Sequence, residues 1–130
     1  MSLGRVLIVD DEAPIRQMVR VLLTKAGYDV LEAENGEQAI STARKHPLQI
    51  STIICDIAMP KVNGKETIAF LRWQFPSVPI IVLTGYPIVD EALSLLNRGV
   101  VDYLSKPITN SKLLEAVSKA IQQKRSPADQ

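Results

Sequence analysis

The chain has 130 residues, with 15 basic and 14 acidic side chains and a formal net charge of +1. This length predicts a single domain, and hydrophobic residues at 46 % of the chain are enough for a core that folds without a disulfide or metal staple. The balanced charge argues against direct binding of nucleic acid, which requires a strongly basic surface.

The sequence contains one cysteine, Cys55, and one histidine, His46, so neither a disulfide framework nor a zinc site built on these residue types is expected. No apolar run approaches the roughly 20 residues that a bilayer-spanning helix needs. The first apolar stretch, residues 6–9, is short and leads into two aspartates, unlike a signal peptide. We therefore expect a cytoplasmic location and no contact with a membrane.

Short apolar runs alternate with segments of helical period along the chain. The runs predict strands at residues 6–9, 30–31, 53–55, 80–83 and 100–104. They are continuously apolar rather than alternating, which is typical of strands covered on both faces of a parallel sheet.

The segments between the strands predict helices. The first has Pro14 near its start, Gly27 just past its end, and an apolar stripe made of Ile15, Val19, Leu22, Leu23 and Ala26. Later helices are expected at about residues 35–45, at about 65–74, between 87 and 98, and around 113–121. Strand and helix repeated five times indicate an α/β fold, a doubly wound five-stranded parallel sheet of the (βα)5, flavodoxin-like kind with strand order 2-1-3-4-5. We expect its core at about residues 5–122, followed by a polar tail or a linker to an output domain at residues 123–130.

Polar residues follow four of the predicted strands. Asp10 and Asp11 come after the first strand, Asp56 after the third, Thr84 after the fourth and Lys106 after the fifth. Ligands of a doubly wound sheet bind beyond the carboxyl ends of its strands, so these side chains are expected to converge. Each residue alone is equally well explained as a helix cap, a turn residue or a solvated side chain.

Three carboxylates brought together repel one another unless a cation neutralises them. Carboxylate oxygens suit Mg²⁺, which typically takes one or two protein carboxylates together with waters and phosphate oxygens. An acidic Mg²⁺ site beside a lysine indicates phosphoryl chemistry.

The residues around these positions resemble the receiver domain of bacterial two-component response regulators, in particular the receivers similar to chemotaxis regulators. Four motifs carry the resemblance: Val9-Asp10-Asp11-Glu12, Asp56-Ile57-Ala58-Met59-Pro60 with Gly64, Leu83-Thr84-Gly85, and Tyr103-Leu104-Ser105-Lys106-Pro107. They occur in order, each at the end of a predicted strand, and the resemblance covers about residues 5–122.

This resemblance implies a chemical role for each matched residue. Asp56 is the implied phosphoacceptor, and its carboxylate attacks the phosphorus of a phosphohistidine or a small acyl phosphate. Asp11, Asp56 and the backbone carbonyl of Ala58 are the implied Mg²⁺ ligands, with Asp10 acting through water. Lys106 is implied to stabilise the phosphoryl group, and its peptide bond to Pro107 is a candidate for the cis form.

The resemblance also implies a switch. Thr84 is expected to donate a hydrogen bond to the phosphoryl group, and the Tyr103 ring then turns inward, which changes the face formed by the fourth helix, the fifth strand and the fifth helix. The implied partners are a sensor histidine kinase or phosphotransfer protein, a downstream effector or attached output domain, and a second copy in a homodimer that depends on phosphorylation. The chain is then not an enzyme beyond its own phosphotransfer and slow autodephosphorylation.

Two positions that tune phosphate lifetime in this family are Ala58 and Tyr86 here. Neither side chain orients an attacking water well, so we expect slow loss of phosphate, with Tyr86 shielding the phosphoryl group. Gly85 stands where many relatives carry alanine, and its effect on the switch is open.

Three other functions fit the sequence less well. A Mg²⁺-dependent phosphohydrolase with an aspartate nucleophile has a second aspartate two residues beyond the first, where this chain has Ala58. An unphosphorylated pseudo-receiver, acting only as an interaction module, is disfavoured by the intact set of aspartates with Thr84 and Lys106. A flavodoxin-type flavin site is excluded because Asp10, Asp11 and Glu12 would repel the flavin phosphate.

Two aromatic residues have no role in the receiver-domain interpretation. Phe70 and Trp73 are three residues apart on the third predicted helix, offset from the stripe that faces the sheet. Ordinary surface packing and a patch that binds a partner are both open interpretations.

Overall fold

The structure is a computed structural model that describes residues 2–46, 49–57 and 64–125. In these parts of the chain, strands and helices alternate in the order β1 (Arg5–Val9), α1 (Ala13–Lys25), β2 (Asp29–Ala33), α2 (Gly36–Lys45), β3 (Thr52–Cys55), α3 (Gly64–Gln74), β4 (Ile80–Thr84), α4 (Val89–Asn97), β5 (Asp102–Ser105) and α5 (Asn110–Arg125).

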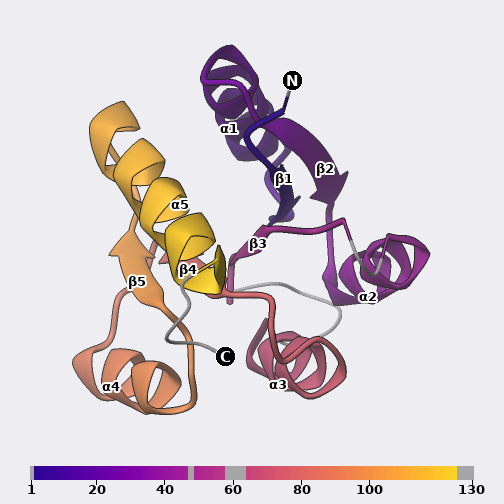
Figure 1. Cartoon of the computed structure of the whole chain (residues 1–130). Helices are drawn as coiled ribbons and strands as arrows, with labels where there is room; N and C mark the ends of the chain where they lie inside the picture. Colours follow the sequence, from indigo (N-terminus) through magenta and orange to yellow (C-terminus); the bar gives the residue numbers. More distant parts are fainter. Residues whose placement is uncertain (1, 47–48, 58–63, 126–130) are drawn as a thin grey trace.

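The strands form one parallel sheet in the order β2-β1-β3-β4-β5 (Figure 1), which confirms the predicted fold. The register aligns the carboxyl ends of neighbouring strands. Val9 lies opposite both Ala33 and Cys55, and Thr84 lies opposite Ser105. The residues that follow these strands therefore lie together at one edge of the sheet.

Helices cover both faces of the sheet. Figure 1 shows α1 and α5 on one side and α2, α3 and α4 on the other. Alternate residues of β1 serve the two faces, since Val6 and Ile8 pack with α1 and α5, whereas Leu7 and Val9 pack with the other layer. Burial on both sides explains the continuous apolar runs, and each fully buried Leu or Ile contributes about 1.5–3 kcal/mol.

Glycines end two helices at positions where the backbone φ is positive. Gly27 follows α1 with φ 103°, and Gly99 follows α4 with φ 99°. After α4, the N–H of Gly99 donates to the carbonyl of Leu96 and that of Val100 to the carbonyl of Leu95. This pair of hydrogen bonds is a Schellman motif, which satisfies two carbonyl groups at the end of the helix.

Three elements differ from the sequence prediction by more than one residue at an end. The fifth strand begins at Asp102 rather than residue 100, because the Val100 N–H still caps α4. The second strand is longer, Asp29–Ala33. The last helix continues to Arg125, into the segment predicted as a polar tail.

The two aromatic residues of α3, Phe70 and Trp73, differ in their surroundings. Trp73 is 78 % exposed, whereas Phe70 is half-buried, with the Arg44 guanidinium 5.3 Å from its ring centre. Arg44 thus shields one face of Phe70, as an ordinary cation–π contact does. None of the helices in the described residues is long and apolar enough to cross a membrane.

Candidate functional site

Four acidic side chains meet at the carboxyl edge of the sheet. One carboxylate oxygen from each of Asp10, Asp11, Glu12 and Asp56 lies within 4.8 Å of all the others. We call these four residues the acidic cluster. Asp10 and Asp56 directly follow β1 and β3, and Asp11 and Glu12 form the turn into α1.

The backbone fixes the residues that follow the strands. The N–H of Asp10 donates to the carbonyl of Ala33, 3.1 Å away, and the N–H of Asp56 donates to that of Val9, 2.9 Å away. On the other side, the N–H of Lys106 donates to the carbonyl of Thr84 at 2.7 Å. The sheet ladder therefore continues one step beyond the strands and sets the direction of these side chains.

Lys106 reaches across the edge of the sheet into the acidic cluster. Its Nζ atom lies 2.8 Å from Asp10 Oδ2, 3.1 Å from Asp56 Oδ2 and 3.1 Å from Glu12 Oε1. The peptide bond that follows, between Lys106 and Pro107, is cis. One ammonium group thus touches three of the four carboxylates.

Burial and charge oppose each other at this site. Burial raises the pKa of the Asp10 carboxyl, although Lys106 and the Glu12 N–H both favour its charged form. Burial alone would lower the pKa of Lys106, but the carboxylates of Asp10, Glu12 and Asp56 outweigh it and raise that pKa. Among the described residues, Asp10 Oδ2 has the Lys106 ion pair but no hydrogen bond of good geometry. Lys106 therefore stays charged at neutral pH.

The donor set fits a hard divalent cation. Four carboxylates face one ammonium group, so negative charge remains for a cation to neutralise. Asp11 and Glu12 are exposed while Asp10 and Asp56 are buried, which leaves the cluster accessible from solvent. Cys55 is no competing ligand, because burial raises the pKa of its thiol and keeps it protonated. Ala58, expected to add a backbone carbonyl, lies outside the described residues.

Thr84 and Tyr86 take different positions at the end of β4. Thr84 is buried, and its hydroxyl oxygen accepts a hydrogen bond from the Tyr86 N–H at 3.1 Å. The Tyr86 side chain is 78 % exposed, so the shielding of a phosphoryl group that the sequence suggested stays a prediction. The residue between them, Gly85, lies close to Lys106, whose Cδ would be 4.0 Å from an added Cβ.

Tyr103 is directed toward α4 and not into the acidic cluster. Its hydroxyl donates to Glu91 Oε1 at 3.0 Å and accepts from the Ile88 N–H at 3.3 Å. The other Glu91 oxygen lies 2.7 Å from Lys65 Nζ on α3. Burial, together with the Glu91 carboxylate, raises the pKa of the Tyr103 hydroxyl. Glu91 and Lys65 were not among the residues predicted from the sequence, because a contact among β5, α4 and α3 leaves no local signal.

A comparison with known proteins decides the family. The family model described as the response regulator receiver domain matches residues 6–118. This chain is a response regulator receiver domain. The membership confirms the resemblance inferred from the four motifs and disfavours the phosphohydrolase reading.

Similar proteins place the receiver domain among regulators. The chain is 35 % identical over 116 residues to the transcriptional regulatory protein ZraR of Klebsiella oxytoca. The matched region is 89 % of this chain but 26 % of ZraR. A receiver domain protein from Clostridium thermocellum has a TM-score of 0.89 at 31 % identity, covering 95 % of this chain and 98 % of that one. The beryllofluoride-activated NtrC4 receiver domain dimer has a TM-score of 0.86 at 29 % identity, covering 92 % and 98 %.

Proposed function

We propose that this receiver domain is a signalling switch that accepts a phosphoryl group on Asp56. The observation that carries the proposal is the position of the Lys106 ammonium, which touches Asp56 and Asp10 inside the acidic cluster. A carboxylate nucleophile, a fixed cation and a donor set for a divalent metal ion are the parts that phosphoryl transfer needs.

The chemistry at Asp56 is a displacement at phosphorus. An Asp56 oxygen attacks the phosphorus of a phosphohistidine or acyl phosphate, a new O–P bond forms, and the leaving group departs with the electrons of the broken bond. Negative charge develops on the phosphoryl oxygens, and the Lys106 ammonium, 3.1 Å from the nucleophilic carboxylate, stabilises it.

The acidic cluster would hold Mg²⁺ through Asp11, Asp56 and the Ala58 carbonyl, with Asp10 acting through water. When bound, this ion neutralises charge on the cluster and on the incoming phosphoryl oxygens. The fit rests on the all-oxygen donors and on the excess of carboxylates over ammonium groups at the site.

The readout begins at Thr84 and ends on α4. The Thr84 oxygen accepts from Tyr86 N–H, so its own proton is available to a phosphoryl oxygen. Such a bond draws in the loop that follows β4, and this loop leads to Ile88, whose N–H holds the Tyr103 hydroxyl. A shift there alters the face made of α4, β5 and α5.

The partners follow from this role. A histidine kinase or phosphotransfer protein supplies the phosphoryl group, and an effector or attached output domain receives the signal. ZraR is a transcriptional regulator far longer than the matched region, which supports an output domain. The likeness to the activated NtrC4 receiver dimer supports a homodimer that forms on phosphorylation. Turnover of a separate substrate is not part of the proposal.

Intact mass spectrometry tests the proposal. Incubation with a small acyl phosphate and Mg²⁺ should add one phosphoryl group to the native chain and to Asp90→Asn, a control that removes an exposed carboxylate on α4. Asp56→Asn should gain none. Mg²⁺ binding without an adduct would favour a pseudo-receiver, and continuous release of phosphate would favour a hydrolase.

A further inference from the structure

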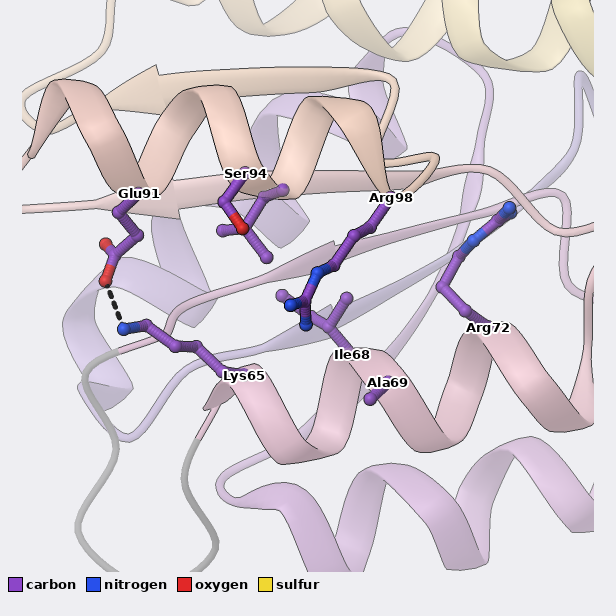
Figure 2. Close-up of a pocket in the computed structure, with 8 residues that line it drawn as sticks. Lys65, Ile68, Ala69, Arg72, Glu91, Ser94 and Arg98 are labelled. Atoms are coloured by element: carbon purple, nitrogen blue, oxygen red, sulfur yellow. Dashed lines mark ion pairs between the residues drawn. The ribbon is translucent and has the colours of Figure 1, made fainter.

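A pocket lies between α3 and α4, on the side of the sheet away from α1 and α5 (Figure 2). Its volume is about 280 Å³. Its apolar part consists of Ile68 and Ala69 on α3 and Leu95 on α4. A pocket of this size lies just below the usual range of ligand sites, which is about 300–1,000 Å³. It suits a molecule about as large as one aromatic ring with a single substituent.

The charged residues around this pocket are unequal in number. Lys65, Arg72 and Arg98 contribute three cations, and Glu91 contributes one carboxylate. Figure 2 shows Glu91 directed from α4 to Lys65 on α3, and these two side chains form an ion pair at 2.7 Å. The pair neutralises itself, so the two guanidinium groups give the pocket its net positive charge.

The two arginines have few partners. In the part of the chain that the structure describes, the Arg98 side chain has no hydrogen bond or ion pair, and Figure 2 shows its guanidinium group extending from α4 toward α3 near Ile68. Arg72 donates through Nη1 to the Pro76 carbonyl at 3.2 Å, while its buried Nε has no hydrogen-bond partner among those residues.

Arg72 is also held in position. It packs against the backbone of Gly99, where an added Cβ would overlap the guanidinium group. The Arg72 guanidinium is therefore committed to the end of α4 and to the Pro76 carbonyl, so Arg98 is the arginine positioned to meet a ligand.

We propose that this pocket binds a small organic anion, with one carboxylate or phosphate group facing Arg98 and an apolar body over Ile68, Ala69 and Leu95. A guanidinium group presents its N–H donors in a planar fork that matches both oxyanions. The site contains no member of the acidic cluster, so an anion bound there does not occupy the proposed phosphoacceptor. An acidic side chain of a partner protein is the competing occupant, and it predicts no binding of free anions.

Amide chemical-shift titration of the whole chain by NMR tests the site. Benzoate and phenyl phosphate serve as probes, and benzamide serves as the uncharged analogue of benzoate. Low ionic strength preserves the attraction, and omission of Mg²⁺ keeps phenyl phosphate away from the acidic cluster. Both anions should give saturable shifts concentrated in α3 and α4, and benzamide should give none of comparable size.

Variants connect the shifts to Arg98. Arg98→Gln should weaken benzoate binding roughly tenfold or more, since it removes a charge-assisted hydrogen bond. Arg98→Lys keeps the positive charge but not the planar fork of donors. Its affinity for benzoate should lie between those of the native chain and Arg98→Gln. Lys119→Gln, which removes one exposed cation from α5, should bind as the native chain does. Equal shifts with benzamide, unchanged affinity in a folded Arg98→Gln variant, or no saturable shift with either anion would overturn the proposal.

Discussion

The acidic cluster and helix α4 are held in place in different ways. At the cluster, Asp10 and Asp56 are 0 % and 3 % exposed, and hydrogen bonds to neighbouring strands fix both backbones. These residues follow strands whose side chains are almost all buried. Asp10 and Asp56 therefore stand at the ends of strands that are buried in the core of the fold.

Helix α4 is anchored much more weakly. Of its nine residues, Leu95 is the buried one, whereas Val89 and Leu93 are 75 % and 57 % exposed. Its N-cap residue, Ile88, supplies no side-chain hydrogen bond. Elements with few buried contacts open at lower free energy than core strands do. The part proposed to change shape is thus less costly to move than the core strands.

Truncation of apolar side chains in the core strands and in α4 should give the largest difference in the free energy of unfolding. Ile54→Ala in β3 empties space in the core and should lower the free energy of unfolding by about 2–5 kcal/mol. Leu93→Ala on α4 removes a largely exposed side chain and should change it by about 0.5 kcal/mol or less. Urea unfolding measures both. A large loss in Leu93→Ala would show that α4 is packed more firmly than its exposure indicates.

Mg²⁺ should stabilise the cluster side of the molecule. At one hundred times its Kd, a ligand that binds only the folded state adds about 2.7 kcal/mol to the free energy of unfolding. Asp11→Asn should abolish most of this gain and leave the core intact, because Asp11 is exposed. Thermal melts with and without Mg²⁺ measure the effect, with Asp90→Asn as the control. Equal stabilisation of Asp11→Asn and the native chain would remove Asp11 from the ligand set.

On the α4 side, Glu91→Gln should act on Tyr103 more than on stability. The change removes the ion pair with Lys65, in which the lysine is half-exposed, so the free energy of unfolding should fall by about 0.5 kcal/mol. Burial and the Glu91 charge together raise the Tyr103 pKa, so loss of that charge should lower it. NMR titration of the tyrosine ring signals measures the shift.

Glu115→Gln is the matched control for that experiment. It removes an exposed carboxylate that pairs with Lys119 on α5, a helix that packs on the opposite face of the sheet from Tyr103. The Tyr103 pKa should stay as in the native chain. A pKa that rises in Glu91→Gln, or falls equally in both variants, would contradict the contact between Tyr103 and Glu91.

The fold could be predicted from the sequence because burial on both faces leaves an unambiguous pattern. Residues 6–9, 53–55 and 80–83 are continuously apolar, and all of them are buried in the sheet. The carboxyl-edge positions of Asp10, Asp56, Thr84 and Lys106 follow directly from parallel strands in register.

Contacts between distant elements could not be predicted in the same way. Glu12 contacts Lys106, 94 positions along the chain, and only the three-dimensional path of both segments brings them together. Glu91 reads locally as an acidic residue in the first turn of a helix, which favours the helix dipole. Its role as a partner of both Tyr103 and Lys65 arises from packing among three elements.

Gly85 connects the two regions. It follows Thr84 at the rigid edge and opens the loop to α4, and an added Cβ would meet nothing nearer than Lys106 Cδ at 4.0 Å. Its φ lies outside the left-handed region, so Gly85→Ala should fit and stabilise the fold by about 0.4–1 kcal/mol through lower entropy of the unfolded chain. Urea unfolding measures this gain. A loss of stability would mean that the loop needs the backbone freedom of glycine even in the unphosphorylated domain. The movable segment would then include Gly85 and begin directly after Thr84.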